Sequence, residues 1–239
     1  MAEVTTCCFS RVALLMILYI LHQPCVAECT LIFNWLSFEG VTGVSIIGGA
    51  REAKGTALWA CKLAGSTDCP NGGATDLWIE QVTCGPGHGI SIGSLAKDLE
   101  QEGVQNVTVK NAIFKGTQNG LRIKSWARPS NRFVQGVQFL DVVMFNVQNP
   151  IVIDQNYCPH NINCPAQVSG VKVSDVVYQN IRGTSATAIA IKFDCSATNP
   201  CSGIRLENVS LTSRNQEIQS HCANANGKIV GTVQPNVCL

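Results

Sequence analysis

Charge is scarce in this chain of 239 residues. Asp, Glu, Lys and Arg make up 14% of it, against roughly 25% in ordinary domains, and the formal net charge is +1. Nucleic-acid binding needs a clustered basic face, so this balance argues against a nucleic-acid partner. No segment approaches the roughly 18 consecutive apolar residues of a transmembrane helix, so no membrane span is predicted. Only 6% of the residues are aromatic and only four are histidine.

Apolar and small polar residues dominate what remains. Hydrophobic residues make up 46% of the chain, which is enough for a core and argues against disorder. Asparagine is unusually frequent at 18 residues, close to the 21 glycines. This composition predicts a body of strands joined by uncharged polar turns.

A short apolar segment lies near the N-terminus. The run from Val12 to Leu21 follows Arg11 and precedes the small-residue stretch that ends at Ala27. Ten residues are too few to span a bilayer, and the pattern fits a secretory signal peptide over 1–27. The remaining 28–239 would then be an exported domain. The alternative is a hydrophobic N-terminal strand or cap.

The cysteine pattern agrees with export. Of 13 cysteines, loss of 1–27 removes Cys7, Cys8 and Cys25 and leaves ten. Eight of the ten form short local pairs that predict disulfides in an oxidising compartment, namely Cys61 with Cys69, Cys158 with Cys164, Cys195 with Cys201, and Cys222 with Cys238. Zinc is the competing interpretation, but the spacings are not Cys-x-x-Cys and histidine is scarce, so no metal site is predicted. In a secreted chain Asn106 and Asn208 would be glycosylation sites.

Internal repetition is the strongest structural signal. Alternating apolar runs start at residues 44, 77, 107, 137, 171 and 204, in steps of 30 to 34 residues, and such a period indicates a solenoid. A second alternating run follows within most repeats, as in Ile90-Ser91-Ile92, Leu121-Arg122-Ile123, Ile151-Val152-Ile153 and Ile189-Ala190-Ile191. Short strands without a helical stripe predict an all-β, right-handed parallel β-helix of about six coils. Asparagines at the coil corners would stack in ladders.

Three basic or titratable side chains fall together on the exposed face of this predicted fold. Arg122 and Lys124 point outward from one coil, and His88 precedes the matching strand of the coil before. An arginine that grips bidentately and a lysine that acts as a point charge suit a carboxylated ligand. The alternative is a solvated strand face on which Lys124 pairs with Asp154 of the next coil.

Four segments resemble one enzyme family, the plant polygalacturonases of glycoside hydrolase family 28. They are Gly-Pro-Gly-His-Gly-Ile-Ser-Ile-Gly-Ser at 85–94, Gly-Leu-Arg-Ile-Lys-Ser-Trp at 120–126, Asn-Pro-Ile-Val-Ile-Asp-Gln-Asn-Tyr-Cys at 149–158 and Ile-Arg-Gly-Thr-Ser at 181–185. The resemblance implies a secreted, monomeric β-helix of the cell wall that hydrolyses the α-1,4 bonds of galacturonan (pectin) with inversion and without a cofactor. It further implies that His88 is the active-site histidine, that Arg122 and Lys124 bind substrate carboxylates, and that Tyr157 lies near the same subsite.

The chain departs from the family where catalysis is concerned. The family's Asn-Thr-Asp and Asp-Asp-Cys motifs, which carry its three catalytic aspartates, are absent, and only Asp76 stands between Cys69 and His88. An internal deletion near 74–77 would account for this, and the family's N-terminal capping stretch is missing too. The family pairs the cysteine before Gly-Pro-Gly-His-Gly with the lost Asp-Asp-Cys cysteine, so Cys84 is expected to lack its family partner, with Cys29 as the other unpaired candidate. Whether Cys84 and Cys29 pair with each other is left open by the sequence.

Hydrolysis is therefore expected to be impaired. The alternatives are a non-catalytic pectin-binding protein and a truncated gene product.

Overall fold

The structure is a computed structural model that describes 74–97, 103–158, 162 and 164–239, together with four short strands nearer the N-terminus. Every regular element in this part of the chain is a strand. The short strands are β1 (Val4–Cys7), β2 (Leu36–Phe38), β3 (Val41–Thr42) and β4 (Ser45–Ile47). The others are β5 (Ala74–Glu80), β6 (Thr83–Cys84), β7 (Gly89–Leu95), β8 (Val104–Lys110), β9 (Ile113–Lys115), β10 (Asn119–Trp126), β11 (Phe133–Val147), β12 (Asn149–Tyr157), β13 (Lys172–Ser185), β14 (Ile189–Asp194), β15 (Cys201–Thr212), β16 (Gln219–Ala223) and β17 (Ala225–Gln234).

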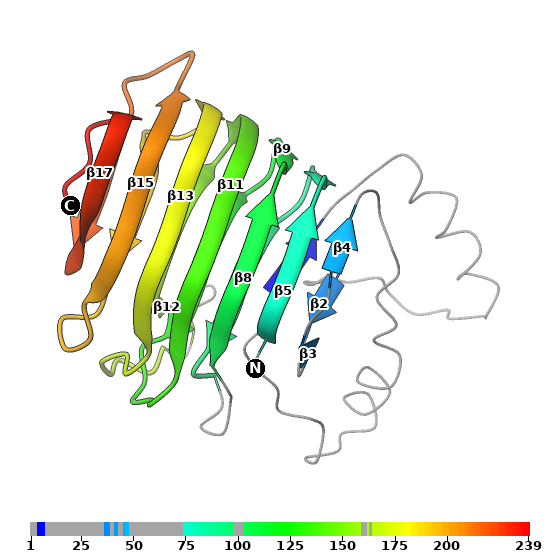
Figure 1. The fold of residues 1–239 in the computed structure, drawn as a ribbon. Helices are drawn as coiled ribbons and strands as arrows, with labels where there is room; N and C mark the ends of the chain where they lie inside the picture. Colours follow the sequence, from blue (N-terminus) through cyan, green and yellow to red (C-terminus); the bar gives the residue numbers. More distant parts are fainter. Residues whose placement is uncertain are drawn as a thin grey trace.

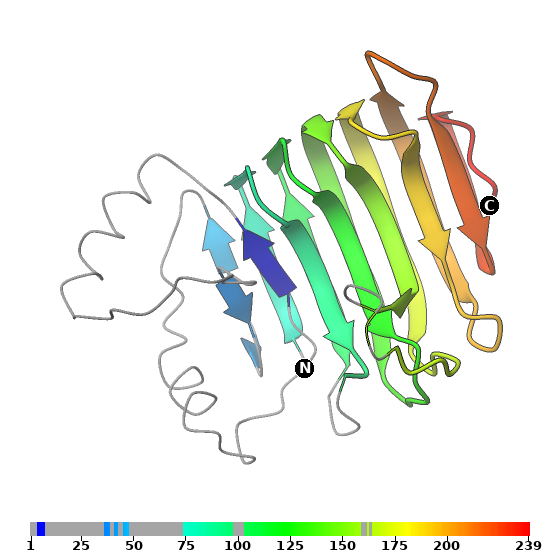
Figure 2. The same ribbon diagram turned by 180° about the vertical axis from the view of Figure 1, so that it is seen from behind.

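The strands form two sheets that face each other. A ten-stranded sheet carries the order β17-β15-β13-β11-β8-β5-β3 and is seen from the front in Figure 1. Its three remaining strands lie off this path: β4 pairs with β5, β9 with β11, and β6 with β9. A seven-stranded sheet with the order β16-β14-β12-β10-β7-β1-β2 comes to the front in Figure 2. The chain passes from one sheet to the other and back in each coil, and the coils stack in sequence order. This path confirms the predicted all-β parallel β-helix.

Pairing is parallel throughout both sheets except at β1, which pairs antiparallel with β2 and β7. Strand β1 lies inside the segment predicted to be a signal peptide, and that peptide remains a prediction.

Most repeat positions are confirmed by the register, and two are wrong. Leu77 lies beside Val107, and Val107 beside Val137. Val137 faces Val176, however, five residues beyond the predicted start at Val171. Val171 and Val173 precede a residue of positive φ, Asp175, after which the alternation restarts in the opposite phase. In the other sheet Ile151 likewise faces Ile191, where the repeat pattern had aligned it with Ile189.

A residue of positive φ marks the same corner in successive coils. Five such residues have φ between 54° and 65°, namely Asp76, Asn106, Gly136, Asp175 and Gly203. Asparagine, aspartate and glycine tolerate this region at little cost, which explains their abundance. Asn106 Nδ2 donates to Asp76 Oδ1 at 2.9 Å, and Asn208 Nδ2 donates to Asn180 Oδ1 at 3.4 Å. The predicted asparagine ladders are therefore confirmed, and both predicted glycosylation sites belong to them.

The core consists of side chains stacked coil upon coil between the two sheets. Phe139 and Tyr178 stack with ring centroids 5.1 Å apart, and Phe193 from the opposite sheet lies 6.0 Å from Tyr178. All three are fully buried. Each fully buried large apolar side chain contributes about 1.5–3 kcal/mol, so these layers hold the sheets together and fix which residues face outward.

Three of the predicted disulfides are confirmed. They join Cys158 to Cys164, Cys195 to Cys201, and Cys222 to Cys238. Cys84, a candidate for an unpaired cysteine, is instead disulfide-bonded. The Cys61–Cys69 pair and Cys29 lie outside the described residues.

The described residues contain no helix long and apolar enough to cross a membrane. They also contain no cluster of three or more His, Cys, Asp or Glu side chains that could hold a metal ion.

Candidate functional site

Parallel pairing places the two predicted carboxylate binders on the outward face of the seven-stranded sheet, where Lys124 is only 9% exposed. Arg122 of β10 lies between Ser91 of β7 and Val152 of β12, and Lys124 lies beside Asp154. Residues two apart on a strand share a face, so Arg122 and Lys124 point the same way, while Ile123 between them is buried in the core. We call this surface the cationic wall, defined by Ser91, Arg122, Lys124, Asp154 and Tyr157.

Tyr157 joins the cationic wall because β12 contains a bulge. Lys124 pairs with Asp154, and Trp126 pairs with Tyr157. Between these two pairs β12 has one residue more than β10, which is the bulge. Without the extra residue Tyr157 would point into the core, since a shift of one residue moves side chains to the other face. The Asn156 amide N–H donates to Asp154 Oδ1 at 3.0 Å and closes the local turn.

The Tyr157 ring contacts both cations. Lys124 Nζ lies 4.8 Å from the ring centroid and Arg122 Cζ 5.7 Å, and Trp126 packs edge-on against the ring at 5.9 Å. Cation–π attraction of this kind holds the two charged groups toward one point. The predicted meeting of Arg122, Lys124 and Tyr157 is thus present in the geometry, and their roles remain predictions.

Arg122 is held in place by Ser91 on the neighbouring strand β7. Its Nε donates to Ser91 Oγ at 2.9 Å, which leaves the terminal nitrogens of the guanidinium for a ligand. Burial lowers the pKa of Arg122, while Tyr157 and Asp154 act in the opposite direction. An arginine begins so far above neutral pH that it stays charged, and a partly desolvated charge binds a carboxylate more strongly than one in bulk water.

His88 lies just beyond the N-terminal end of β7, the strand that carries Ser91. It precedes β7 and stands three residues before Ser91, about 10 Å along the strand direction at roughly 3.3 Å per residue. Its Nδ1 is 2.7 Å from Gln118 Oε1, and Asn119 Nδ2 donates to the His88 carbonyl at 3.2 Å. An amide oxygen only accepts, so this contact favours the tautomer of the neutral ring that has its proton on Nδ1.

A glycine makes this placement of His88 possible. Gly89 has φ +83°, and a Cβ there would come within 1.8 Å of the Asn119 carbonyl oxygen. The coils touch backbone to backbone at this point, and any larger residue would displace the histidine.

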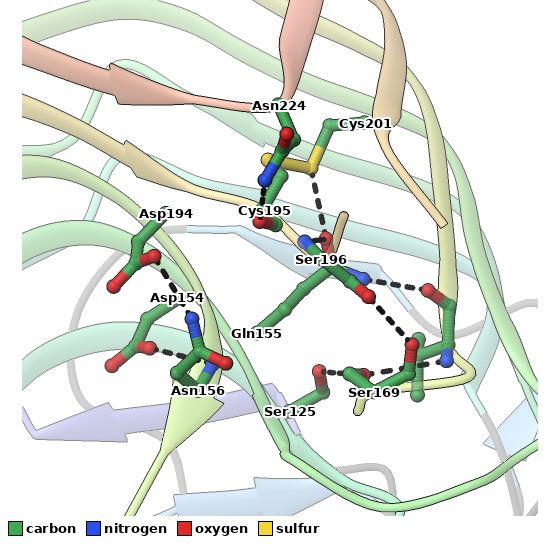
Figure 3. The surroundings of a disulfide bond; sticks show 11 residues. Ser125, Asp154, Gln155, Asn156, Ser169, Asp194, Cys195, Ser196, Cys201 and Asn224 are labelled. Carbon is green, nitrogen blue, oxygen red and sulfur yellow. Dashed lines mark hydrogen bonds between the residues drawn. A yellow bond between two sulfur atoms is a disulfide. The ribbon is translucent and has the colours of Figure 1, made fainter. Parts of the chain in front are cut away.

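The carboxyl group beside the cations is Asp154, whose neighbour on the next strand is Asp194. Asn156 Nδ2 donates to Asp194 Oδ1 at 2.9 Å, and Lys192 pairs with Asp194 at 3.2 Å (Figure 3 shows the two aspartates and Asn156). Burial raises the pKa of Asp154, although Lys192, the Asn156 N–H and Arg122 act against that rise and Asp194 adds to it. Asp154 therefore holds its proton to a higher pH than an ordinary aspartate.

The two carboxylates that remain near the expected deletion lie elsewhere. Asp76 and Glu80 belong to β5 in the ten-stranded sheet. Asp76 accepts from Asn106, and Glu80 accepts from Trp78 and Asn111. Both carboxylates are used in holding coils together, on a different sheet from the cationic wall.

A buried polar network fixes the end of β12 from inside. Gln155, 1% exposed, donates to the Val171 carbonyl at 2.7 Å and accepts from the Ser196 N–H at 2.9 Å, next to the Cys195–Cys201 disulfide (Figure 3). Ser91, Gln118 and Gln155 escaped the sequence analysis, because each role depends on a partner that only the register reveals.

Comparison with known proteins adds an independent observation. The model of the family described as glycosyl hydrolases family 28 matches residues 52–233. The chain is 43% identical to a polygalacturonase of Prunus persica over 86% of this chain and 73% of that one. It is 44% identical to polygalacturonase QRT2 of Arabidopsis thaliana over 68% of this chain and 37% of that one. For polygalacturonase-2 of Solanum lycopersicum the identity is 45%, over 69% and 36% of the two chains.

The chain covers these relatives incompletely. The matched part spans little more than a third of the Arabidopsis and tomato proteins. The alignment with the peach protein is 286 positions long but contains 86% of 239 residues, about 206, so about 80 of its positions face a gap in this chain.

Proposed function

The chain belongs to family 28 of the glycosyl hydrolases, and from this premise we propose that its cationic wall binds the galacturonan of pectin as a polygalacturonase-type site. The observation that carries the proposal is the convergence of Arg122 and Lys124 on the Tyr157 ring. A galacturonate residue offers a carboxylate for the guanidinium and ammonium groups and an apolar sugar face for the ring.

The reaction proposed for such a site is hydrolysis of α-1,4 galacturonosyl bonds with inversion. Inversion needs a carboxylic acid that protonates the leaving oxygen and a carboxylate that activates water, about 6.5–9.5 Å apart so that water fits between them. Asp154 of the cationic wall and its neighbour Asp194 occupy adjacent strands about 4.8 Å apart, and both hydrogen-bond to Asn156. Asn156 links the two aspartates by hydrogen bonds, so this pair does not have the separation that an attacking water requires.

We therefore propose that this chain keeps substrate binding and loses most of the rate. General acid and general base catalysis each contribute typically 10²–10⁴-fold, so a site without the pair would retain a small fraction of family activity. The internal gap against the peach relative supports the proposed deletion of coils near 74–77. On this proposal the cationic wall binds galacturonan even where little hydrolysis takes place, so binding and hydrolysis can be measured separately.

The proposed setting is the plant cell wall. Three disulfides among the described residues support an oxidising compartment, in keeping with the predicted signal peptide over 1–27. We propose a monomer that needs no cofactor. At the proposed glycosylation sites, Asn106 and Asn208, the side chains are exposed but their amide nitrogens donate to the ladder, so a glycan there would replace a ladder hydrogen bond.

The test measures binding and hydrolysis on the same sample. Purified chain is passed over immobilised polygalacturonate, and release of reducing ends is followed over days, with Arg122→Ala/Lys124→Ala and His88→Ala in parallel. We expect retention that the double variant weakens, and a rate far below that of a full-length polygalacturonase. A folded chain that passes unretained would refute the proposed binding. A rate comparable to the full-length enzyme, abolished by His88→Ala, would refute the proposed impairment.

A further inference from the structure

A groove lies on the ten-stranded sheet, whereas the cationic wall lies on the seven-stranded one. It crosses the carboxyl-terminal ends of β11, β13 and β15, which lie side by side in the sheet at the front of Figure 1. Two adjoining hollows of about 370 and 470 Å³ make it up, and both are lined by Phe145 and Thr184. We call it the rear groove, defined by Phe145, Arg182, Thr184, Ser210, Thr212 and Arg214.

The lining of the rear groove has one sign of charge. Arg182 belongs to the first hollow and Arg214 to the second, and neither hollow is lined by an aspartate or glutamate. Both arginines are exposed, and within the described residues neither forms a salt bridge. Another arginine of the same sheet, Arg205, lies beside Val177 and forms a salt bridge with Glu207. The arginines of the groove differ from it in having no acidic partner among the described residues. Two planar cations in a groove suit carboxylates spaced along a chain.

An exposed aromatic ring lines the same two hollows as these charges. Phe145 is 50% exposed, the most exposed aromatic side chain among the large hydrophobic residues of the described chain, and it lines both hollows. Its neighbours around the groove, Thr184, Ser210 and Thr212, carry hydroxyls. Asn146 N–H donates to Thr184 Oγ1 at 2.8 Å, which fixes the turn directly after the ring. A flat ring among hydroxyls and cations matches an acidic sugar.

We propose that the rear groove is an accessory binding site for galacturonan, separate from the cationic wall. The inference rests on the proposed function for the identity of the sugar, and its residues play no part in the wall. The two sites lie on different sheets, Phe145 on β11 and Arg122 on β10, and a polymer long enough to reach around the coil engages both. Linked binding of this kind raises the apparent affinity for a polymer above that for a short oligomer.

The experiment compares polymer and oligomer binding in matched variants. The groove variant is Arg182→Gln/Arg214→Gln, with Phe145→Ala as a second groove variant that removes no charge. The matched control is Lys172→Gln/Lys228→Gln, which removes two exposed cations of the same sheet outside the groove. Each is measured by affinity electrophoresis in polygalacturonate and by calorimetry with trigalacturonate, also in the Arg122→Ala/Lys124→Ala background. Circular dichroism confirms that the variants fold.

The expected results separate the two sites. Both groove variants should weaken polygalacturonate binding at least tenfold, the control pair should bind within twofold of the unmodified chain, and the wall variant should still bind through the groove. Unchanged polymer binding in both groove variants would overturn the accessory site while leaving the proposed function intact. Loss of binding in the groove variants alone would support the accessory site and count against the wall. If polyglutamate bound as strongly as polygalacturonate, the groove would recognise carboxylate charge and not the sugar. That result would overturn the proposed sugar site.

Discussion

Replacement of Arg122 by lysine tests whether the cationic wall recognises a carboxylate by shape or by charge alone. The Nε of the Arg122 guanidinium donates a hydrogen bond to Ser91 Oγ at 2.9 Å, and the group lies over the Tyr157 ring. Its terminal nitrogens are left to contact a ligand. Lysine keeps the positive charge but offers one point of contact in place of two parallel ones. A hydrogen bond between charged groups contributes about 1.5–3 kcal/mol, so loss of one predicts binding weaker by about 10- to 150-fold.

The assay is calorimetric titration with trigalacturonate in the Arg182→Gln/Arg214→Gln background, so that only the wall is measured. Arg205→Lys, on the ten-stranded sheet, is the matched control and should bind as the unmodified chain does. Ser91 is 2% exposed and loses its partner, so Arg122→Lys should also lower the free energy of unfolding by about 1–3 kcal/mol. A dissociation constant within threefold of the unmodified chain would show that the wall acts as charge only, and would refute the bidentate geometry.

Two further predictions follow from buried polar groups. Because burial raises the pKa of Asp154, the folded chain binds more protons than the unfolded one between the ordinary aspartate pKa and the raised value, and stability falls as pH rises through that window. Asp154→Asn should flatten this slope and raise stability at pH 7 in denaturant melts from pH 3 to 8; an unchanged slope would contradict it. The Tyr178 hydroxyl is buried with no hydrogen-bond partner among the described residues, so Tyr178→Phe should stabilise by about 1 kcal/mol, or roughly 2–4 °C in Tm, and a lowered Tm would contradict it.

The sequence predicted the elements of the wall because their pattern is local. Alternation of period two puts Arg122 and Lys124 on one face whatever the rest of the chain does, and the repeat length brings His88 to the neighbouring coil. Tyr157 is different, since its orientation depends on a bulge that adds one residue to β12 opposite β10. Its assignment to the wall came from family resemblance, because alternation alone would have turned the ring inward.

The rear groove and the supporting hydrogen bonds could not be read from the chain at all. Phe145, Arg182 and Arg214 come from three successive coils, and nothing in their local sequence distinguishes them from ordinary surface residues. The same is true of Gln118, which meets His88 across 30 positions. The predicted start at Val171 failed for a related reason, because Asp175 at positive φ resets the alternation and periodicity cannot anticipate it. Register between coils decides such contacts, and it depends on the whole stack.

Stacking also explains how a chain can lose its catalytic coils and keep its binding surface. In a solenoid each repeat contacts only its neighbours, so removal of whole repeats leaves the others intact provided that the new neighbours match. Across the proposed deletion they do match, because Ser45 pairs with Trp78 and Ile46 with Ile79 in parallel register. The wall is built from β7, β10 and β12, all on the later side of that junction. Its geometry therefore does not depend on the coils that we propose were deleted. Insertion of the peach relative's extra residues between Gly73 and Leu77 should restore hydrolysis without changing trigalacturonate affinity at Arg122 and Lys124.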